Sequence, residues 1–234
     1  MSLAFIFPGQ GSQAVGMGRA LADAFVAARL VFEEVDAALG EALTRVIWEG
    51  PDQTLMLTEN AQPALMAVSL AAMRVLETEA GVDLARDARF VAGHSLGEYS
   101  ALAAAGALSI ADTARLLRIR GRAMQKAVPV GTGAMAAALA GVRVKSPMVP
   151  VVANVLAKPI RDPADIVDAL VAQVTGTVRW RDSIAFMADA GVTRFYEVGA
   201  GKVLSGLVRR VAEGASGVSI GTPDDVAAFK ASRS

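Results

Sequence analysis

Residues 90–105, "FVAGHSLGEYSALAAA", decide how the rest of the chain is interpreted. The apolar run at 90–93 predicts a buried strand, and the alanine-rich segment that ends near Ala105 predicts a helix. Between them, residues 93–97 fit the G-x-S-x-G pattern of a nucleophile elbow, a tight turn that exposes a serine. A glycine-rich turn with an incidental serine is the plainer alternative. The strand-to-helix context favours Ser95 as a nucleophile, with the Leu96 N–H as first donor to an oxyanion.

Strand-like and helix-like segments alternate along the whole chain. This pattern predicts a single α/β domain over 1–234, with a doubly wound, mostly parallel sheet flanked by helices. Two strand-like runs within 134–152 are separated by only about ten residues, which is short for a parallel crossover. We therefore expect the second run to pair antiparallel to the first or to lie elsewhere in the sheet. The predicted strands are 3–7, 90–93, 133–139, 149–153, 194–198 and 217–220; the main predicted helices are 19–39, 62–79, 110–127, 163–174, 181–190 and 202–212, with a short one from about 223.

Composition excludes several classes of protein. Hydrophobic residues make up 53% of the 234 residues and aromatic residues 5%, which is typical of aliphatic helices packed on a sheet. Lysine plus arginine equals aspartate plus glutamate, at 23 each, so nothing indicates affinity for nucleic acid or for an anionic membrane. There is no cysteine, which excludes disulfides and thiolate chemistry. The start lacks the basic region of a signal peptide, so we expect a soluble cytoplasmic protein.

A serine nucleophile normally needs a histidine base, and this chain has one histidine, His94. His94 precedes Ser95 directly, and neighbouring side chains on an elbow diverge. We therefore interpret His94 as a packed or hydrogen-bonded residue of the turn. A relay between Ser95 and a histidine from elsewhere in the fold cannot be written for this sequence.

Eight motifs, in this order, resemble those of the malonyl-CoA:acyl carrier protein transacylases of fatty-acid biosynthesis. The resemblance runs from the N-terminus to at least Val211. Residues 5–18 and 92–108 together make it specific, because G-x-S-x-G by itself is weak evidence. The motifs are "FIFPGQGSQAVGMG" (5–18), "AQPALMA" (61–67), "AGHSLGEYSALAAAGAL" (92–108), "RIRGRAMQ" (118–125), "GTGAMAA" (131–137), "VPVVANVLAKPI" (149–160), "VTGTVRWRDSI" (174–184) and "FYEVGAGKVLSGLVRRV" (195–211).

The resemblance implies a fold, a reaction and a set of site residues. Such enzymes carry an α/β-hydrolase-like subdomain with an inserted ferredoxin-like subdomain. They move a malonyl group from coenzyme A to the serine and then to the phosphopantetheine thiol of acyl carrier protein. Malonyl-CoA and acyl carrier protein are thus the implied partners, and the coenzyme A thioester is a substrate; no cofactor or metal is implied.

By motif match, Ser95 would be the nucleophile, and the backbone N–H groups of Gln10 and Leu96 would form the oxyanion hole. Arg120 would bind the malonate carboxylate, which suits a planar guanidinium, and Gln62 would line the pocket. Arg179 occupies the position whose backbone carbonyl orients the catalytic histidine in the family. That arginine is expected at the surface.

One departure from the family is large. In the family a strand at "GTGAMAA" leads into the small subdomain, whereas here only "ALAGVRVKSPM" (138–148) separates it from "VPVVAN". We therefore place a deletion junction near 138–148 and infer that the histidine was lost with the ferredoxin-like subdomain. The segment is removed cleanly at both edges of the insertion and every other motif is intact, which favours an engineered excision over a natural degenerate copy or an isolated subdomain.

Loss of the base from a Ser–His pair costs on the order of a million-fold in rate, while the oxyanion hole and binding groups retain roughly 10³–10⁴ over water. We therefore expect severely impaired malonyl transfer. A non-catalytic subdomain scaffold is one alternative. A serine esterase or thioesterase is another, weakened because such enzymes need a histidine late in the chain.

Overall fold

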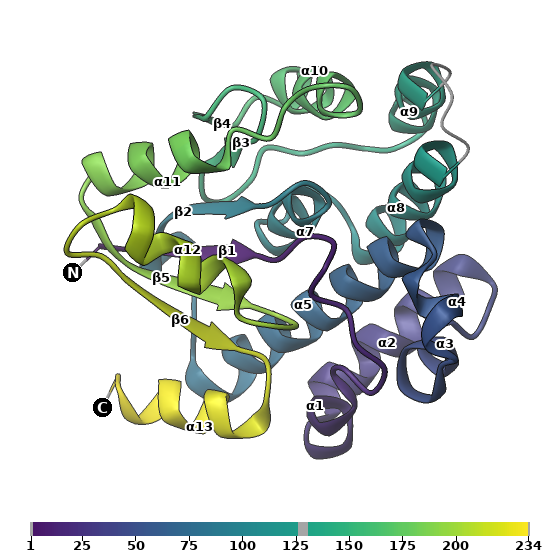
Figure 1. The fold of residues 1–234 in the computed structure, drawn as a ribbon, viewed down its shortest axis with the longest axis horizontal. Helices are drawn as coiled ribbons and strands as arrows, with labels where there is room; N and C mark the ends of the chain where they lie inside the picture. Colours follow the sequence, from purple (N-terminus) through teal and green to yellow (C-terminus); the bar gives the residue numbers. More distant parts are fainter. Residues whose placement is uncertain (1, 126–130, 234) are drawn as a thin grey trace.

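A single sheet organises the chain (Figure 1). The computed structural model describes residues 2–125 and 131–233, and within them six strands lie in the order β4-β3-β2-β1-β5-β6. All neighbouring pairs are parallel except β3–β4, which is antiparallel. The prediction of a mostly parallel, doubly wound sheet is confirmed. The strands are β1 (Ser2–Phe7), β2 (Ala88–Gly93), β3 (Val151–Ala153), β4 (Lys158–Ile160), β5 (Val192–Val198) and β6 (Ser216–Ile220).

Helices cover both faces of the sheet, and the central strand β1 buries side chains on both sides. On β1, Phe5 and Phe7 enter a large core shared with α2, α5, α7 and α8, while Ala4 and Ile6 enter a smaller core under α11 and α12. The helices are α1 (Arg19–Ala24), α2 (Val26–Leu39), α3 (Leu43–Glu49), α4 (Asp52–Met56), α5 (Thr58–Ala80), α6 (Leu84–Asp87), α7 (Gly97–Ala104), α8 (Ile110–Gln125), α9 (Gly131–Ala140), α10 (Pro163–Gln173), α11 (Trp180–Asp189), α12 (Val203–Val211) and α13 (Pro223–Ala231).

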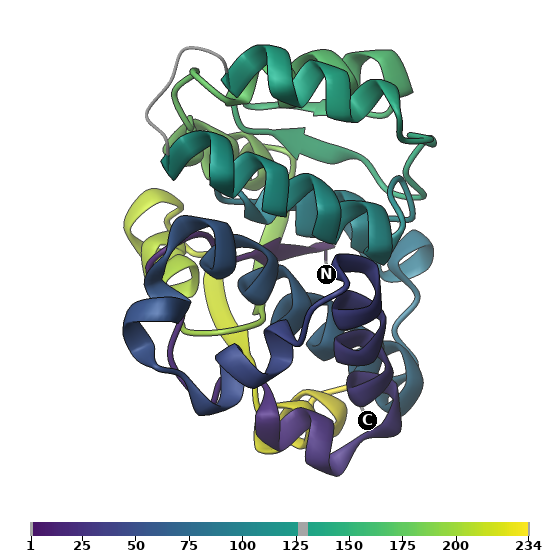
Figure 2. The ribbon, with the colours of Figure 1, turned by 90° about the vertical axis from the view of Figure 1, so that its right-hand side faces the viewer.

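The expected strand at 133–139 is wrong, because this segment forms α9. Residues 133–140 contain no β-branched side chain and five alanines, and alanine has the highest helix propensity. In the fold, α9 packs beside α8 and α10 (Figures 1 and 2) and buries Met135 and Leu139. The run at 149–153 therefore has no strand at 133–139 to pair with, and β3 pairs parallel with β2 instead.

Other boundaries differ in smaller ways. The predicted helix at 19–39 is two helices, because Phe25 adopts an extended backbone between them. Strand β4 and the short helices α3, α4 and α6 were not expected. The predicted end of the helix at 110–127 lies outside the described residues.

Candidate active site

Ser95 lies in a tight turn between β2 and α7. Its backbone is left-handed, with φ of 53°, a conformation that a non-glycine residue adopts at a cost. The two flanking glycines are required by space: a Cβ on Gly93 would lie 1.9 Å from the carbonyl carbon of Gly97, and one on Gly97 would lie 2.3 Å from the oxygen of Phe7. The G-x-S-x-G pattern is therefore a packing requirement of this turn.

Asn154, directly after β3, holds the turn from the neighbouring strand. Its side-chain Oδ1 accepts a hydrogen bond from the Ser95 N–H at 2.7 Å, and its Nδ2 donates to the Gly93 carbonyl at 2.6 Å. The residue is fully buried. Both ends of the amide are thus used to fix the backbone that presents Ser95.

Arg120, on α8, points at the serine. Its Nη2 donates to Ser95 Oγ at 3.1 Å and to Gln173 Oε1 at 3.3 Å, and its Nη1 donates to Gln62 Oε1 at 2.7 Å. Arg120 is 2% exposed, and the hydrogen-bond partners of its guanidinium in the described part of the chain are uncharged. Its Nε is buried and has no partner among the described residues. The structure therefore brings together three residues expected from the sequence, Ser95, Arg120 and Gln62.

One expected oxyanion donor, Leu96, lies in the turn itself, and the loop that carries the other, Gln10, begins beside it. Phe7, at the end of β1, is paired with Gly93, and the His94 N–H donates to the Phe7 carbonyl at 3.0 Å, so the loop carrying Gln10 starts beside the elbow. Leu96 stands at the N-terminus of α7. Neither the Gln10 nor the Leu96 N–H donates a hydrogen bond within the part of the chain that the structure describes. Neither N–H is therefore committed to an acceptor in those ranges.

His94 is packed into the turn, as expected. Its ring meets Trp180 edge to face, with centroids 5.6 Å apart, and burial lowers the pKa of the imidazole. Within residues 2–125 and 131–233 it makes no hydrogen bond to Ser95, whose Oγ accepts from Arg120. Arg179 is exposed as expected, and its carbonyl accepts hydrogen bonds from the N–H and Oγ of Ser183 at 2.9 Å each.

Sequence reasoning missed three buried residues of the site, Glu98, Asn154 and Gln173. Glu98 Oε2 accepts hydrogen bonds from Gln173 Nε2 at 2.6 Å and from the Asn154 N–H at 3.0 Å. Burial raises the pKa of Glu98 to about 7, opposed by those two hydrogen bonds and by the charge of Arg120. A charged residue on an otherwise apolar helix face was the available signal for Glu98. Nothing in the local sequence marks Gln173.

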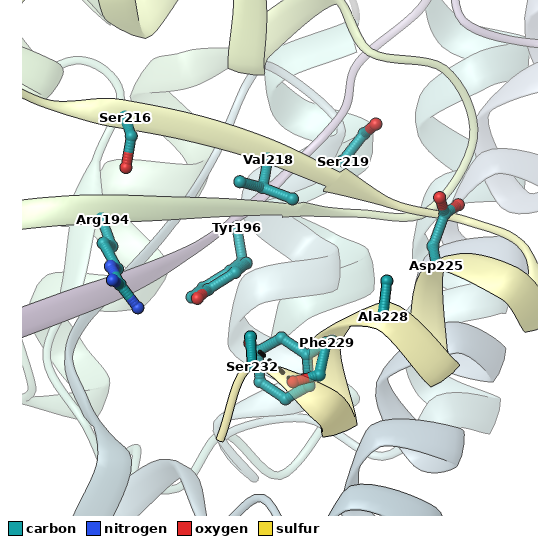
Figure 3. A pocket seen from close by; sticks show the side chains of 9 residues that line it. All are labelled: Arg194, Tyr196, Ser216, Val218, Ser219, Asp225, Ala228, Phe229 and Ser232. Carbon is teal, nitrogen blue, oxygen red and sulfur yellow. Dashed lines mark hydrogen bonds between the residues drawn. The ribbon is translucent and has the colours of Figure 1, made fainter. Parts of the chain in front are cut away.

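Other features of the surface lie apart from this site. A hollow of 340 Å³ between β5, β6 and α13 is lined by Arg194, Tyr196 and Phe229 among others (Figure 3), and by none of the site residues. Over the described residues, no group of three histidine, aspartate or glutamate side chains could hold a metal ion. No helix in the same ranges is both long and apolar enough to cross a membrane.

Comparisons with known proteins show which family the chain belongs to. A profile of the acyl transferase domain family matches residues 4–190. Malonyl CoA-acyl carrier protein transacylase of Bacillus subtilis strain 168 is 34% identical over 305 residues, covering 96% of this chain and 95% of that protein. A crystal structure of acyl-carrier-protein S-malonyltransferase from Bartonella henselae is 40% identical with a TM-score of 0.95, covering 98% of each chain. Another structure, a malonyl-transacylase in complex with a type II polyketide acyl-carrier protein, is 28% identical with a TM-score of 0.91, covering 99% of this chain and 100% of that one. The chain belongs to the acyl transferase domain family and is a relative of the malonyl CoA-acyl carrier protein transacylases.

Proposed function

We propose that the chain is a malonyl-CoA:acyl carrier protein transacylase by descent that acylates Ser95 slowly because it lacks a histidine base. The observation that carries the proposal is the buried Arg120 guanidinium, directed at Ser95 Oγ and hydrogen-bonded to uncharged groups. A buried cation without a direct ion pair is costly, and a carboxylate on the substrate would compensate it. This favours an acyl group that carries a negative charge.

The reaction follows from the residues present. The malonyl carboxylate would bind Arg120, and the thioester carbonyl oxygen would accept from the N–H groups of Leu96 and Gln10. Ser95 Oγ would attack the carbonyl carbon, the carbon–sulfur bond would break, and the coenzyme A thiolate would leave and take up a proton. Without a base, the serine proton passes to solvent, so this step is slow.

We also propose that the ferredoxin-like subdomain is missing, with the junction near 138–148. The alignment with the Bacillus subtilis protein extends over 305 residues, whereas this chain has 234. Residues 141–150 connect α9 to β3 without a helix or strand. The base that the family supplies from that subdomain would be lost with it.

Intact-mass measurement after incubation with malonyl-CoA tests the function. We expect one added malonyl group on the wild type and none on Ser95→Ala. Imidazole added to the buffer should accelerate the adduct by acting as the missing base. Failure of a cooperatively folded wild type to gain the adduct would support the alternative of a non-catalytic scaffold.

Acyl carrier protein is the proposed second partner, as acceptor of the malonyl group. Addition of the phosphopantetheinylated carrier to the malonylated chain should remove the adduct slowly, because deacylation also needs the base. Rapid transfer at rates typical of an intact enzyme would contradict the proposed loss of the base.

A further inference from the structure

We propose that Gln173 is a positioning residue that holds the Arg120 guanidinium over Ser95, with Glu98 fixing the orientation of the Gln173 amide. Together they would set the preference for acyl groups that carry a carboxylate. This inference rests on the proposed function, because it assigns Arg120 to the substrate carboxylate. Neither residue touches the reacting atoms, so neither is a catalytic residue.

The orientation of the Gln173 amide is fixed by its three partners. Nε2 donates to two acceptors, Glu98 Oε2 at 2.6 Å and the Ser95 carbonyl at 3.1 Å, while Oε1 accepts from Arg120 Nη2 at 3.3 Å. A flipped amide would place oxygen against the Glu98 carboxyl and N–H against the guanidinium. The hydrogen bonds of the Gln173 side chain are therefore satisfied in only one orientation of its amide.

Glu98 is buried, and its carboxylate accepts hydrogen bonds from site residues rather than from a helix N-terminus. Glu197, the other buried carboxylate among the described residues, accepts hydrogen bonds from the N–H groups of Leu204 and Ser205 at the start of α12. Glu98 instead uses Oε2 for Gln173 Nε2 and the Asn154 N–H, and its Oε1 has no partner in the described ranges. Burial of such a group is costly. The hydrogen bond that Glu98 accepts from Gln173 holds the amide that in turn accepts from Arg120.

Gln62 and Gln173 hold the guanidinium from two sides. Gln62 accepts from Nη1 and Gln173 from Nη2, the nitrogen that also reaches Ser95 Oγ. If the Gln173 amide were removed, Gln62 would be the only amide still bonded to the guanidinium, which could then pivot about Nη1. A displacement of about 1 Å in a positioning group can cost roughly a hundredfold in rate.

Equilibrium binding separates this role from a structural one. Calorimetry on Ser95→Ala, which cannot be acylated, gives dissociation constants for malonyl-CoA and acetyl-CoA. We expect the parent to prefer malonyl-CoA, and Gln173→Leu to lose about tenfold of that preference while its acetyl-CoA affinity stays the same. Damage to the elbow would instead weaken both ligands.

Two further variants and a control complete the test. Gln173→Asn keeps the amide but is one methylene too short to reach Arg120 and Glu98 together, so it should lose the preference even if Gln173→Leu does not fold. Glu98→Gln keeps an oxygen that can accept both hydrogen bonds and should retain the preference. Gln53→Leu, at an exposed position of α4, is the matched control.

The outcomes separate the two proposals. A parent that binds both thioesters equally would overturn the role of Arg120 in the proposed function, and this inference with it. A parent that prefers malonyl-CoA, with the preference intact in both Gln173 variants, would overturn this inference only.

Discussion

The Nη2 atom of Arg120 donates a hydrogen bond to Ser95 Oγ across 3.1 Å. The residue proposed to bind the substrate carboxylate thus already contacts the nucleophile in the free protein. Because Nη2 is also bonded to Gln173, both of its hydrogens are used. A bound carboxylate would compete with the serine for this nitrogen, and its arrival would release Oγ for attack.

Arg120→Lys should lower the rate of Ser95 malonylation by about 10–100-fold, because an ammonium group cannot replace a guanidinium that bonds three residues at once. The time course of the intact-mass adduct measures this rate. Arg122→Lys is the control, since Arg122 is exposed and pairs with Glu59. Equal rates in the wild type and Arg120→Lys would show that the guanidinium fork is dispensable.

Gly97→Ala should destabilise the fold by about 3 kcal/mol or more, because its Cβ would lie 2.3 Å from the Phe7 oxygen and 2.8 Å from that of Pro8. Gly206→Ala, in helix α12, meets no atom within 4 Å and should instead stabilise by about 0.5–1 kcal/mol. Urea unfolding of both variants gives the comparison. Gly97→Ala as stable as the wild type would contradict the close approach of β1 to the elbow.

Ser95→Gly should be more stable than Ser95→Ala by up to about 1 kcal/mol, because glycine adopts the φ of 53° without strain. The difference is smaller than the full strain energy, because glycine loses more conformational entropy on folding than alanine does. Neither variant has the hydroxyl, so the difference between their free energies of unfolding reports the strain of the backbone at this position. Chemical denaturation measures it. The opposite order would mean that the elbow is not strained.

The raised pKa of Glu98 predicts a specific pH dependence of stability. Below pH 4.5, its ordinary value, the carboxyl is protonated in both states and costs nothing. Between pH 4.5 and about 7 the unfolded chain loses this proton while the folded protein keeps it, so stability falls as pH rises. Above about pH 7 the carboxyl is ionised in both states, and the loss in free energy of unfolding levels off at about 3 kcal/mol.

Glu98→Gln removes this titration, so its free energy of unfolding should rise relative to the wild type by about 3 kcal/mol between pH 4.5 and pH 7.5. Denaturant unfolding at several pH values measures the difference. Glu34→Gln, at an exposed position of α2, is the matched control for loss of a carboxylate. A difference that does not change with pH would show that Glu98 titrates normally.

What the sequence predicts correctly here is local. The elbow follows from two glycines around Ser95 and from the change in periodicity between β2 and α7, which a window of about fifteen residues contains. The identification of Arg120 and Gln62 came from motif resemblance, since isolated helix residues carry no such signal. Asn154 and Gln173 could not be predicted as site residues, because their hydrogen bonds to the Ser95 backbone join positions 59 and 78 residues apart in the sequence.

The error at α9 has a different cause. Met135 and Leu139 are spaced by four and suit a helix, but the short run of small and apolar residues around them is also compatible with a buried strand. The expectation of a strand came from interpreting this apolar run as strand-like. With α8 and α10 as its neighbours, the segment instead follows the propensity of its alanines.

The hydrogen bonds that converge on Ser95 come from residues 25, 59 and 78 positions away. Closing such long loops costs chain entropy that only nearly complete tertiary contacts repay. A partly collapsed chain could therefore form the elbow but would hold no guanidinium over it. Binding of a thioester at this site accordingly requires the assembled tertiary structure, and a bound thioester would stabilise the folded state over any chain that lacks these contacts.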